Sequence, residues 1–230
     1  MKCLLSVSLA TLAVAATFSL TGRAQTPELR QGVSVQMAST THAADYTAAD
    51  NADAWIVTVT SDGKLYFGTK SVRPQQLMEE MKVTPRHRDA KLYIKADARA
   101  PFGEVEQVLE TGRAVFFEKP VLLTSQVESP SRGTVVPPKG LEVLLGSPVG
   151  SDAIVVQVSD DGRQGATVKI NNQQISSAAL PNTLVQLLQH RSEKVVVVKA
   201  DGRLPSADVV QVIDACRAAG AKIVLATPSL

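Results

Sequence analysis

The sequence predicts an α+β protein made of two tandem small two-layer domains, each a mixed β-sheet with two helices on one face. Three observations support this prediction: an internal repeat, the order of strands and helices within each copy, and a Pro-rich stretch between the copies. Residues 95–124 recur as residues 199–227, and ten of the twenty residues from 95 to 114 meet an identical residue 104 positions later. A repeat of this strength makes each copy one folding unit.

Each repeat is predicted to contain a strand, a turn, a helix and a closing strand. β-Branched and aromatic residues precede Lys95 and Lys199, as is typical of strands. Pro101 and Pro205 favour the start of a helix, and Ser206 is a candidate N-cap. Apolar residues then recur at i, i+3, i+4 and i+7, namely Val105, Val108, Leu109 and Gly112, and Val209, Val212, Ile213 and Cys216.

A β-hairpin and a short helix are expected upstream of each repeat. Asp62-Gly63 and Asp161-Gly162 are strong hairpin signals between apolar runs. Pro74 opens the short helix of the first copy, while Asn182 or Thr183 caps that of the second.

The N-terminus has the pattern of an export signal. Lys2 is followed by apolar or small residues over 3–20, and Gly22 and Ala24 suit a cleavage site before Gln25. The alternative is an uncleaved membrane anchor, since residues 3–20 approach the length of a spanning helix. Either way, the remainder is expected to be exported.

The domain boundaries follow from the repeat and from the Pro-rich stretch before residue 139. They are 1–24 for the signal peptide or anchor, 26–127 for the first copy, 128–138 for the linker, and 139–230 for the second copy. Residues 25–51 lack periodicity and are expected to form a mobile arm. Within it, residues 32–39 suit a short edge strand, and residues 140–147 of the second copy have a similar sequence.

Composition excludes several classes of function. The chain has 24 basic and 22 acidic residues, and removing residues 1–24 with Lys2 and Arg23 leaves 22 of each. A neutral chain is not built to attract nucleic acid. Phosphate loops, Ser-centred elbows and metal-ligand spacings are absent from the sequence, so neither an enzyme nor a cofactor is expected. Cys216 lies on the apolar stripe and is predicted to be buried.

The two repeated turns are the candidate partner-binding residues. They are Lys95, Asp97, Arg99 and Phe102 in the first copy, and Lys199, Asp201 and Arg203 in the second. The alternative is structural, because an Asp after a strand bonds nearby backbone amides while Lys and Arg stay solvated.

Residues 93–124 and the upstream Asp-Gly hairpin resemble the periplasmic domain of the ExbD/TolR biopolymer-transport family. Tyr93 to Asp97 and Pro101 to Val105 carry most of the resemblance, whereas Ser206-Ala207 replaces Phe102-Gly103 in the second copy. The resemblance implies a non-enzymatic part of a proton-driven inner-membrane motor. It also implies periplasmic dimers that engage a TonB-like or TolA-like protein, or peptidoglycan.

Members of that family carry a proton-responsive Asp in their membrane helix, but residues 3–20 contain no acid. The first hypothesis is therefore a periplasmic protein that acts by protein–protein interaction, with its two copies paired as an intramolecular pseudo-dimer. The second is a soluble periplasmic protein that binds peptidoglycan or a small solute. A third, a membrane-anchored motor subunit, requires an uncleaved helix at residues 3–20.

Overall fold

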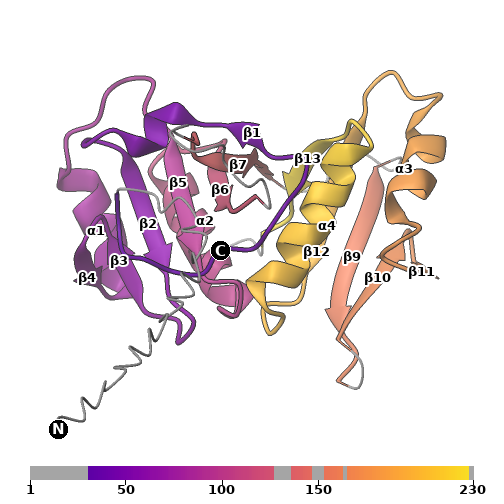
Figure 1. Ribbon diagram of the computed structural model, residues 1–230, viewed down its shortest axis with the longest axis horizontal. Coiled ribbons are helices and arrows are strands. Elements are labelled where there is room, and N and C mark those ends of the chain that lie inside the picture. The colour runs from indigo at the N-terminus through magenta and orange to yellow at the C-terminus, as the bar shows by residue number, and fades with distance from the viewer. Residues whose placement is uncertain (1–30, 127–135, 147–152, 163–164, 228–230) are drawn as a thin grey trace, which may run out of the picture.

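The computed structural model describes residues 31–126, 136–146, 153–162 and 165–227. This part of the chain forms two mixed sheets side by side, each with two α-helices (Figure 1). The predicted fold class is confirmed. The predicted signal peptide or anchor and most of the predicted linker lie outside the described residues. Among the described helices, none has the length and apolar character needed to span a membrane.

The first sheet has the strand order β1-β7-β6-β5-β2-β3-β4. Its strands are β1 (Ala44–Asp45), β2 (Trp55–Val59), β3 (Leu65–Phe67), β4 (Lys70–Val72), β5 (Leu92–Ala96), β6 (Val121–Thr124) and β7 (Lys139–Glu142). β2, β5 and β6 are parallel, while β3, β4 and β7 join antiparallel. The helices of this half are α1 (Pro74–Val83) and α2 (Phe102–Ala114), and η1 (Thr47–Asp50) is a short 3₁₀ helix.

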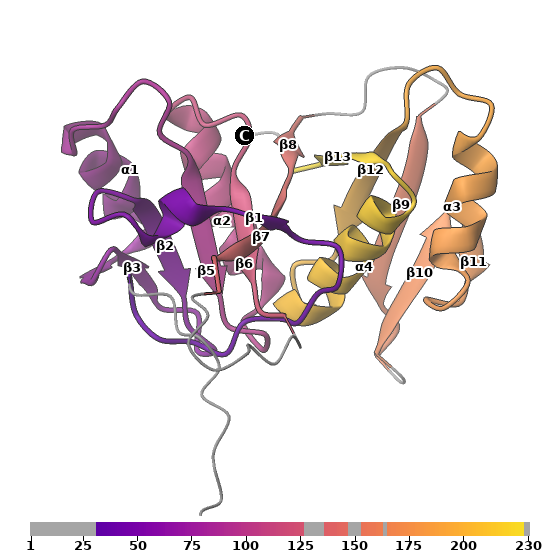
Figure 2. The ribbon, with the colours of Figure 1, turned by 45° about the horizontal axis from the view of Figure 1, so that its top comes forward.

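The second sheet has the order β11-β10-β9-β12-β13-β8. Its strands are β8 (Leu144–Leu145), β9 (Ile154–Asp160), β10 (Ala166–Ile170), β11 (Gln173–Ile175), β12 (Val195–Ala200) and β13 (Lys222–Leu225). The helices are α3 (Leu180–Leu188) and α4 (Ser206–Ala218), and α4 lies across β12 in both ribbon views (Figures 1 and 2).

The repeat is preserved in the register of the strands. Trp55 is paired with Leu92 in the first half, and their equivalents Ile154 and Val196 are paired in the second. Both predicted hairpins are present, and Gly63 supplies the positive φ of +78° that its turn requires. Each hairpin gains a third strand, β4 or β11, which the sequence patterns did not indicate.

Two helix starts differ from the prediction. α3 begins at Leu180, ahead of the predicted caps Asn182 and Thr183. Ser206 is the first residue of α4, and Pro205 occupies the N-cap position. The Ser206 hydroxyl donates to the Ala100 carbonyl of the first half at 2.9 Å. The Ser206 hydroxyl proton thus makes a contact between the halves.

The main hydrophobic core is continuous between the halves. It contains fully buried side chains of both, such as Val57 and Leu109 from the first half and Val156 and Ile213 from the second. One contiguous core is the usual sign of one cooperative unit. The two copies are therefore two lobes of one packed body.

One short segment hydrogen-bonds to both sheets. β7 pairs antiparallel with β6 of the first half, and β8, which follows directly, pairs parallel with β13 of the second. Figure 2 shows β7 in the first sheet and β8 at the edge of the second. Residues 139–145, assigned by sequence to the second copy, thus extend the first sheet before entering the second.

The described part of the expected mobile arm is packed, so that expectation is wrong from residue 31 onward. The predicted edge strand at 32–39 is reduced to an isolated bridge between Ser39 and Ser125. Beside it, the Thr40 hydroxyl donates to that of Thr124 at 2.8 Å, and both side chains are buried. Alternation alone could not reveal these contacts because their partners lie more than eighty residues away.

Candidate functional site

The two repeated turns meet where the halves join. Pro101 and Pro205 form an isolated antiparallel bridge. Around it lie two pairs of backbone hydrogen bonds. In the first pair, the Phe102 N–H donates to Leu204 O and the Ser206 N–H to Ala100 O, both at 2.8 Å. In the second, the Gly103 N–H donates to Gly202 O at 2.8 Å and the Ala207 N–H to Ala98 O at 2.9 Å. Adding 104 to the donor's number and subtracting 104 from the acceptor's number converts one bond of each pair into the other, so the contact is reciprocal. A self-complementary contact of this kind is what a two-fold axis produces.

Each turn contains the same Asp–Arg arrangement. Asp97 Oδ1 accepts from the backbone N and Nε of Arg99 at 3.0 and 3.1 Å. Asp201 Oδ1 accepts from the same two atoms of Arg203 at 3.0 and 3.1 Å. Each carboxylate thus fixes its own turn and holds the adjacent guanidinium, as the structural alternative anticipated.

Burial separates the candidate residues into two groups. Lys95, Asp97 and Phe102 are buried, with Phe102 fully so. The side chains of Arg99 and Arg203 are 71% and 74% exposed, and Lys199 is also exposed. A partner that touches this region would meet the two guanidinium groups first.

The two carboxylates are held ionised by their Arg neighbours. Burial raises the pKa of Asp97, but hydrogen bonds from Arg99 and from the Gln36 amide outweigh it and leave that pKa below its usual value. The hydrogen bond from Arg203 lowers the pKa of Asp201 to about 2. Both carboxylates are therefore ionised at neutral pH.

Glu106 on α2 is a site residue that the sequence reading missed. A Cβ placed on Gly202 would lie 3.4 Å from its Oε2, so the carboxyl reaches the turn of the other half. Burial, together with the charges of Glu110 and Asp201, raises the pKa of Glu106 to about 7. The repeat held a signal, because the equivalent position in α4 is the buried Val210.

Asp214 on α4 clamps the N-terminal segment and was also missed. It accepts from the backbone amides of Thr41 and His42 at 3.1 and 2.9 Å, and lies 3.1 Å from His42 Nδ1. Arg217 Nε donates to His42 O at 2.9 Å. The first half's segment is thereby tied to the second half's helix, a contact that no spacing in the sequence indicates.

Two residues have the structural role expected of them. Trp55 is buried and packs edge-on against Phe67 with ring centroids 5.3 Å apart. Cys216 is fully buried, and burial raises the pKa of its thiol to about 12, which removes it as a nucleophile. Across the described ranges, no group of His, Cys, Asp and Glu is arranged to hold a metal ion.

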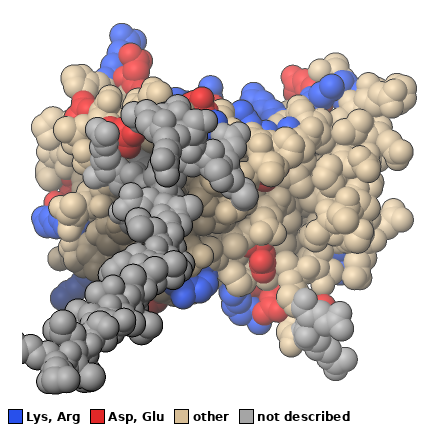
Figure 3. Space-filling model, viewed as in Figure 1, with Lys and Arg blue, Asp and Glu red and all other residues tan. Residues whose placement is uncertain are grey.

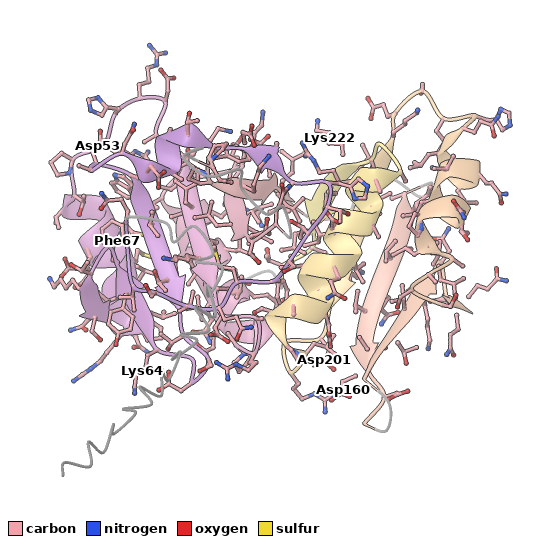
Figure 4. All side chains as sticks on the ribbon, in the orientation of Figure 1. Asp53, Lys64, Phe67, Asp160, Asp201 and Lys222 are labelled. Atoms are coloured by element: carbon pink, nitrogen blue, oxygen red, sulfur yellow. The ribbon has the colours of Figure 1, made fainter. Side chains whose placement is uncertain are left out.

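A hollow of about 660 Å³ lies beside η1 in the first half. Tyr46, Trp55 and Tyr93 contribute aromatic lining, and Arg86 and Lys91 contribute positive charge. Asp53, labelled in Figure 4, also lines it. On the face seen in Figure 3, charges of both signs are mixed, in keeping with the balanced composition.

These features define a duplicated two-layer α+β protein whose copies meet through a reciprocal contact. The family model for biopolymer transport protein ExbD/TolR matches residues 9–127 and again residues 121–229. The chain belongs to the ExbD/TolR family, which confirms the resemblance seen in its sequence, and members of this family are components of biopolymer transport. No curated protein and no solved structure matched the chain.

Proposed function

We propose that this chain is a non-enzymatic periplasmic component of an ExbD/TolR-like energy-transduction system, acting by protein–protein interaction as an intramolecular pseudo-dimer. The reciprocal hydrogen bonds around Pro101 and Pro205 carry this proposal. They are supported by the hydrophobic core common to both halves. Joining the copies in one chain raises their effective concentration, so pairing needs no second molecule.

The proposed partner surface is the pair of turns, and within them the exposed guanidinium groups of Arg99 and Arg203. A guanidinium has five N–H donors. Arg203 uses two of them, one on Nε and one on Nη2, to bind the carboxylate of Asp201. The remaining donors can bind a carboxylate or backbone carbonyl of a TonB-like or TolA-like protein or of an inner-membrane motor. In Figure 4 Asp201 lies close to Asp160 at the lower end of the second half.

The chain acts without a proton-coupling Asp of its own. An ionisable group in the bilayer is what makes a membrane helix respond to protons. Residues 3–20, the candidate segment, contain no Asp or Glu. Protein sequencing of the exported chain tests the export step, because a mature N-terminus at Gln25 excludes a membrane-anchored motor subunit.

Photo-crosslinking in the cell envelope tests the partner surface. A crosslinking residue at Arg99 or Arg203 should capture an inner-membrane motor protein or a TonB-like or TolA-like protein. The matched control is Gln75, which is exposed on α1 away from the turns. Equal capture of the same protein from Gln75, or none from either turn, contradicts the proposal.

The hollow beside Tyr46 favours the second candidate function, the binding of peptidoglycan or a small solute. Aromatic and charged side chains together suit a polar ligand with apolar surface. Sedimentation with purified cell wall separates the two candidates. Binding that is lost in Tyr46→Ala but kept in Tyr66→Ala, a β3 control, would support the second.

A further inference from the structure

The two sheets differ in how their helix-free faces are covered. In the first half Ile56, Thr58, Tyr93 and Lys95 are all buried. The equivalent positions in the second half are Val155, Gln157, Val197 and Lys199. We call the helix-free face of the second sheet, which these four residues define, the open face. Gln157 and Lys199 are exposed and Val155 is half-buried, while Val197 stays buried.

The cover of the first half is its own N-terminal segment. A Cβ on Gly32 would lie 3.0 Å from Thr58 Oγ1 and 3.3 Å from Ile56 Cγ2, so this backbone lies directly on β2. Lys95 Nζ donates to Gln31 O at 3.5 Å. Met37 and Tyr46 pack on Ile56 and Tyr93 in a second apolar cluster. The first half therefore shows what this face of the fold binds: an extended backbone.

The second half is too short to cover itself in the same way. Thirteen residues, 40–52, separate Ser39 from Asp53, whereas four, 148–151, separate the equivalent Ser147 and Asp152. The preceding segment is already used, because β7 and β8 pair with β6 and β13. The open face instead borders a hollow of about 630 Å³ lined by Gln157, Lys199 and other residues.

The charge of the open face selects its occupant. Val168, Ile223 and Leu225 point into the core, so their neighbours Lys169 and Lys222 share the face with Lys199. In β9, β10, β12 and β13 no acidic residue occupies a position on that face. Among the described residues, Lys199 has no ion-pair partner. Figure 4 shows Lys222 at the opposite end of this half from Asp201.

We propose that the open face binds an extended, acidic peptide segment of a partner protein, laid across β9 and β12 as residues 31–37 lie across β2 and β5. The side chain of Lys199 would donate to a backbone carbonyl or carboxylate of that segment, in the way that Lys95 donates to Gln31. The open face meets the second turn only at Lys199, whereas the proposed function depends on Arg99 and Arg203. The inference therefore goes beyond the proposed function, and either can fail alone.

The probe is a capped hexapeptide of alternating Glu and Thr, titrated into the isotopically labelled full-length chain. Amide chemical shifts should change at Gln157, Asn171 and Lys199, and salt should weaken the binding. Lys199→Glu should weaken binding by about fivefold or more, since an attraction becomes a repulsion. Lys82→Glu, an exposed site on α1, is the control and should bind as the unaltered chain does.

Three results of the peptide titration would overturn the inference: shifts confined to the first half, equal affinity for a Gln-for-Glu peptide, or no effect of Lys199→Glu. A light-scattering mass of two chains that reverts to one in Lys199→Glu would make a second copy the occupant, and would also overturn it. A melting temperature unchanged by Lys199→Glu shows that the variant is folded.

Discussion

Pro101 and Pro205 face each other in an antiparallel bridge, each one residue before the helix that its own copy contributes. Proline has no N–H, so the backbone bonds are made by the residues on either side. Those bonds join Phe102 to Leu204 and Ser206 to Ala100. The motif that looked like a partner-binding edge is thus also where the protein binds its own second copy.

Gly202→Ala should separate the two turns. A Cβ there would lie 3.0 Å from Gly103 Cα and 3.3 Å from Gly103 N, both of them backbone atoms that cannot rotate away. We expect the free energy of unfolding to fall by about 1–3 kcal/mol, as for other overpacked contacts. Gly146→Ala is the control for urea denaturation, because its nearest neighbour would be 3.8 Å away. Equal stability of the two variants would refute the close contact.

Glu106→Gln should remove a pH dependence. The folded-state pKa of Glu106 is about 7 against an ordinary 4.5, so the folded chain binds more protons between these values than the unfolded chain. The free energy of unfolding therefore falls as pH rises from 4.5 to 7. Glu106→Gln should flatten this part of the curve.

Thermal melts of the two chains across pH 4.5 to 7 measure this difference. Glu79→Gln, exposed on α1, is the control and should retain the decline. Parallel curves for the unaltered chain and Glu106→Gln would show that the carboxyl is not buried at the contact.

Asp214→Ala should release the N-terminal segment from α4. The amides of Thr41 and His42 would lose their acceptor, and such losses cost about 1–3 kcal/mol. Hydrogen exchange at these two amides should accelerate. Glu110→Ala, the equivalent change on α2, should leave both rates unchanged, and slow exchange in Asp214→Ala would contradict the clamp.

Phe116→Gly should stabilise the protein. Phe116 has a φ of 70° and is 84% exposed, while its equivalent Gly220 has a φ of 74°. Left-handed backbone is unfavourable for a residue with a Cβ, so we expect a gain of roughly 0.5–1 kcal/mol after the entropy of glycine is counted. Gly220→Ala should lose about 1 kcal/mol by the same rule. Urea midpoints for both variants measure it, and a destabilised Phe116→Gly would mean that the ring makes contacts in solution.

The repeat was enough to predict the two-layer fold, because matched strands, Asp-Gly turns and apolar stripes act locally. Cys216 and Trp55 were also predicted correctly to be buried by these local rules. At the Asp97–Arg99 turn, the bond from Asp97 to a nearby backbone amide is the one that the structural alternative described. The extra strands β4 and β11 were not predicted, because each has three residues, which are too few to show alternation of apolar and polar side chains.

The residues that join the halves could not be found from local patterns. Asp214 acts on Thr41, and Ser206 acts on Ala100, across more than a hundred residues of sequence. Differences between equivalent positions of the repeat are more informative. Glu106 is equivalent to Val210, and Phe116 to Gly220, and both pairs mark places where the two halves differ in role.

The intramolecular pairing of the two copies is tested most directly by scalar couplings through hydrogen bonds in NMR spectra. Chains labelled with both ¹⁵N and ¹³C should show couplings from the Phe102 amide to the Leu204 carbonyl and from Ser206 to Ala100. An equal mixture of singly labelled chains should show neither. Couplings in the mixture, or none in the doubly labelled chain, would contradict the pseudo-dimer.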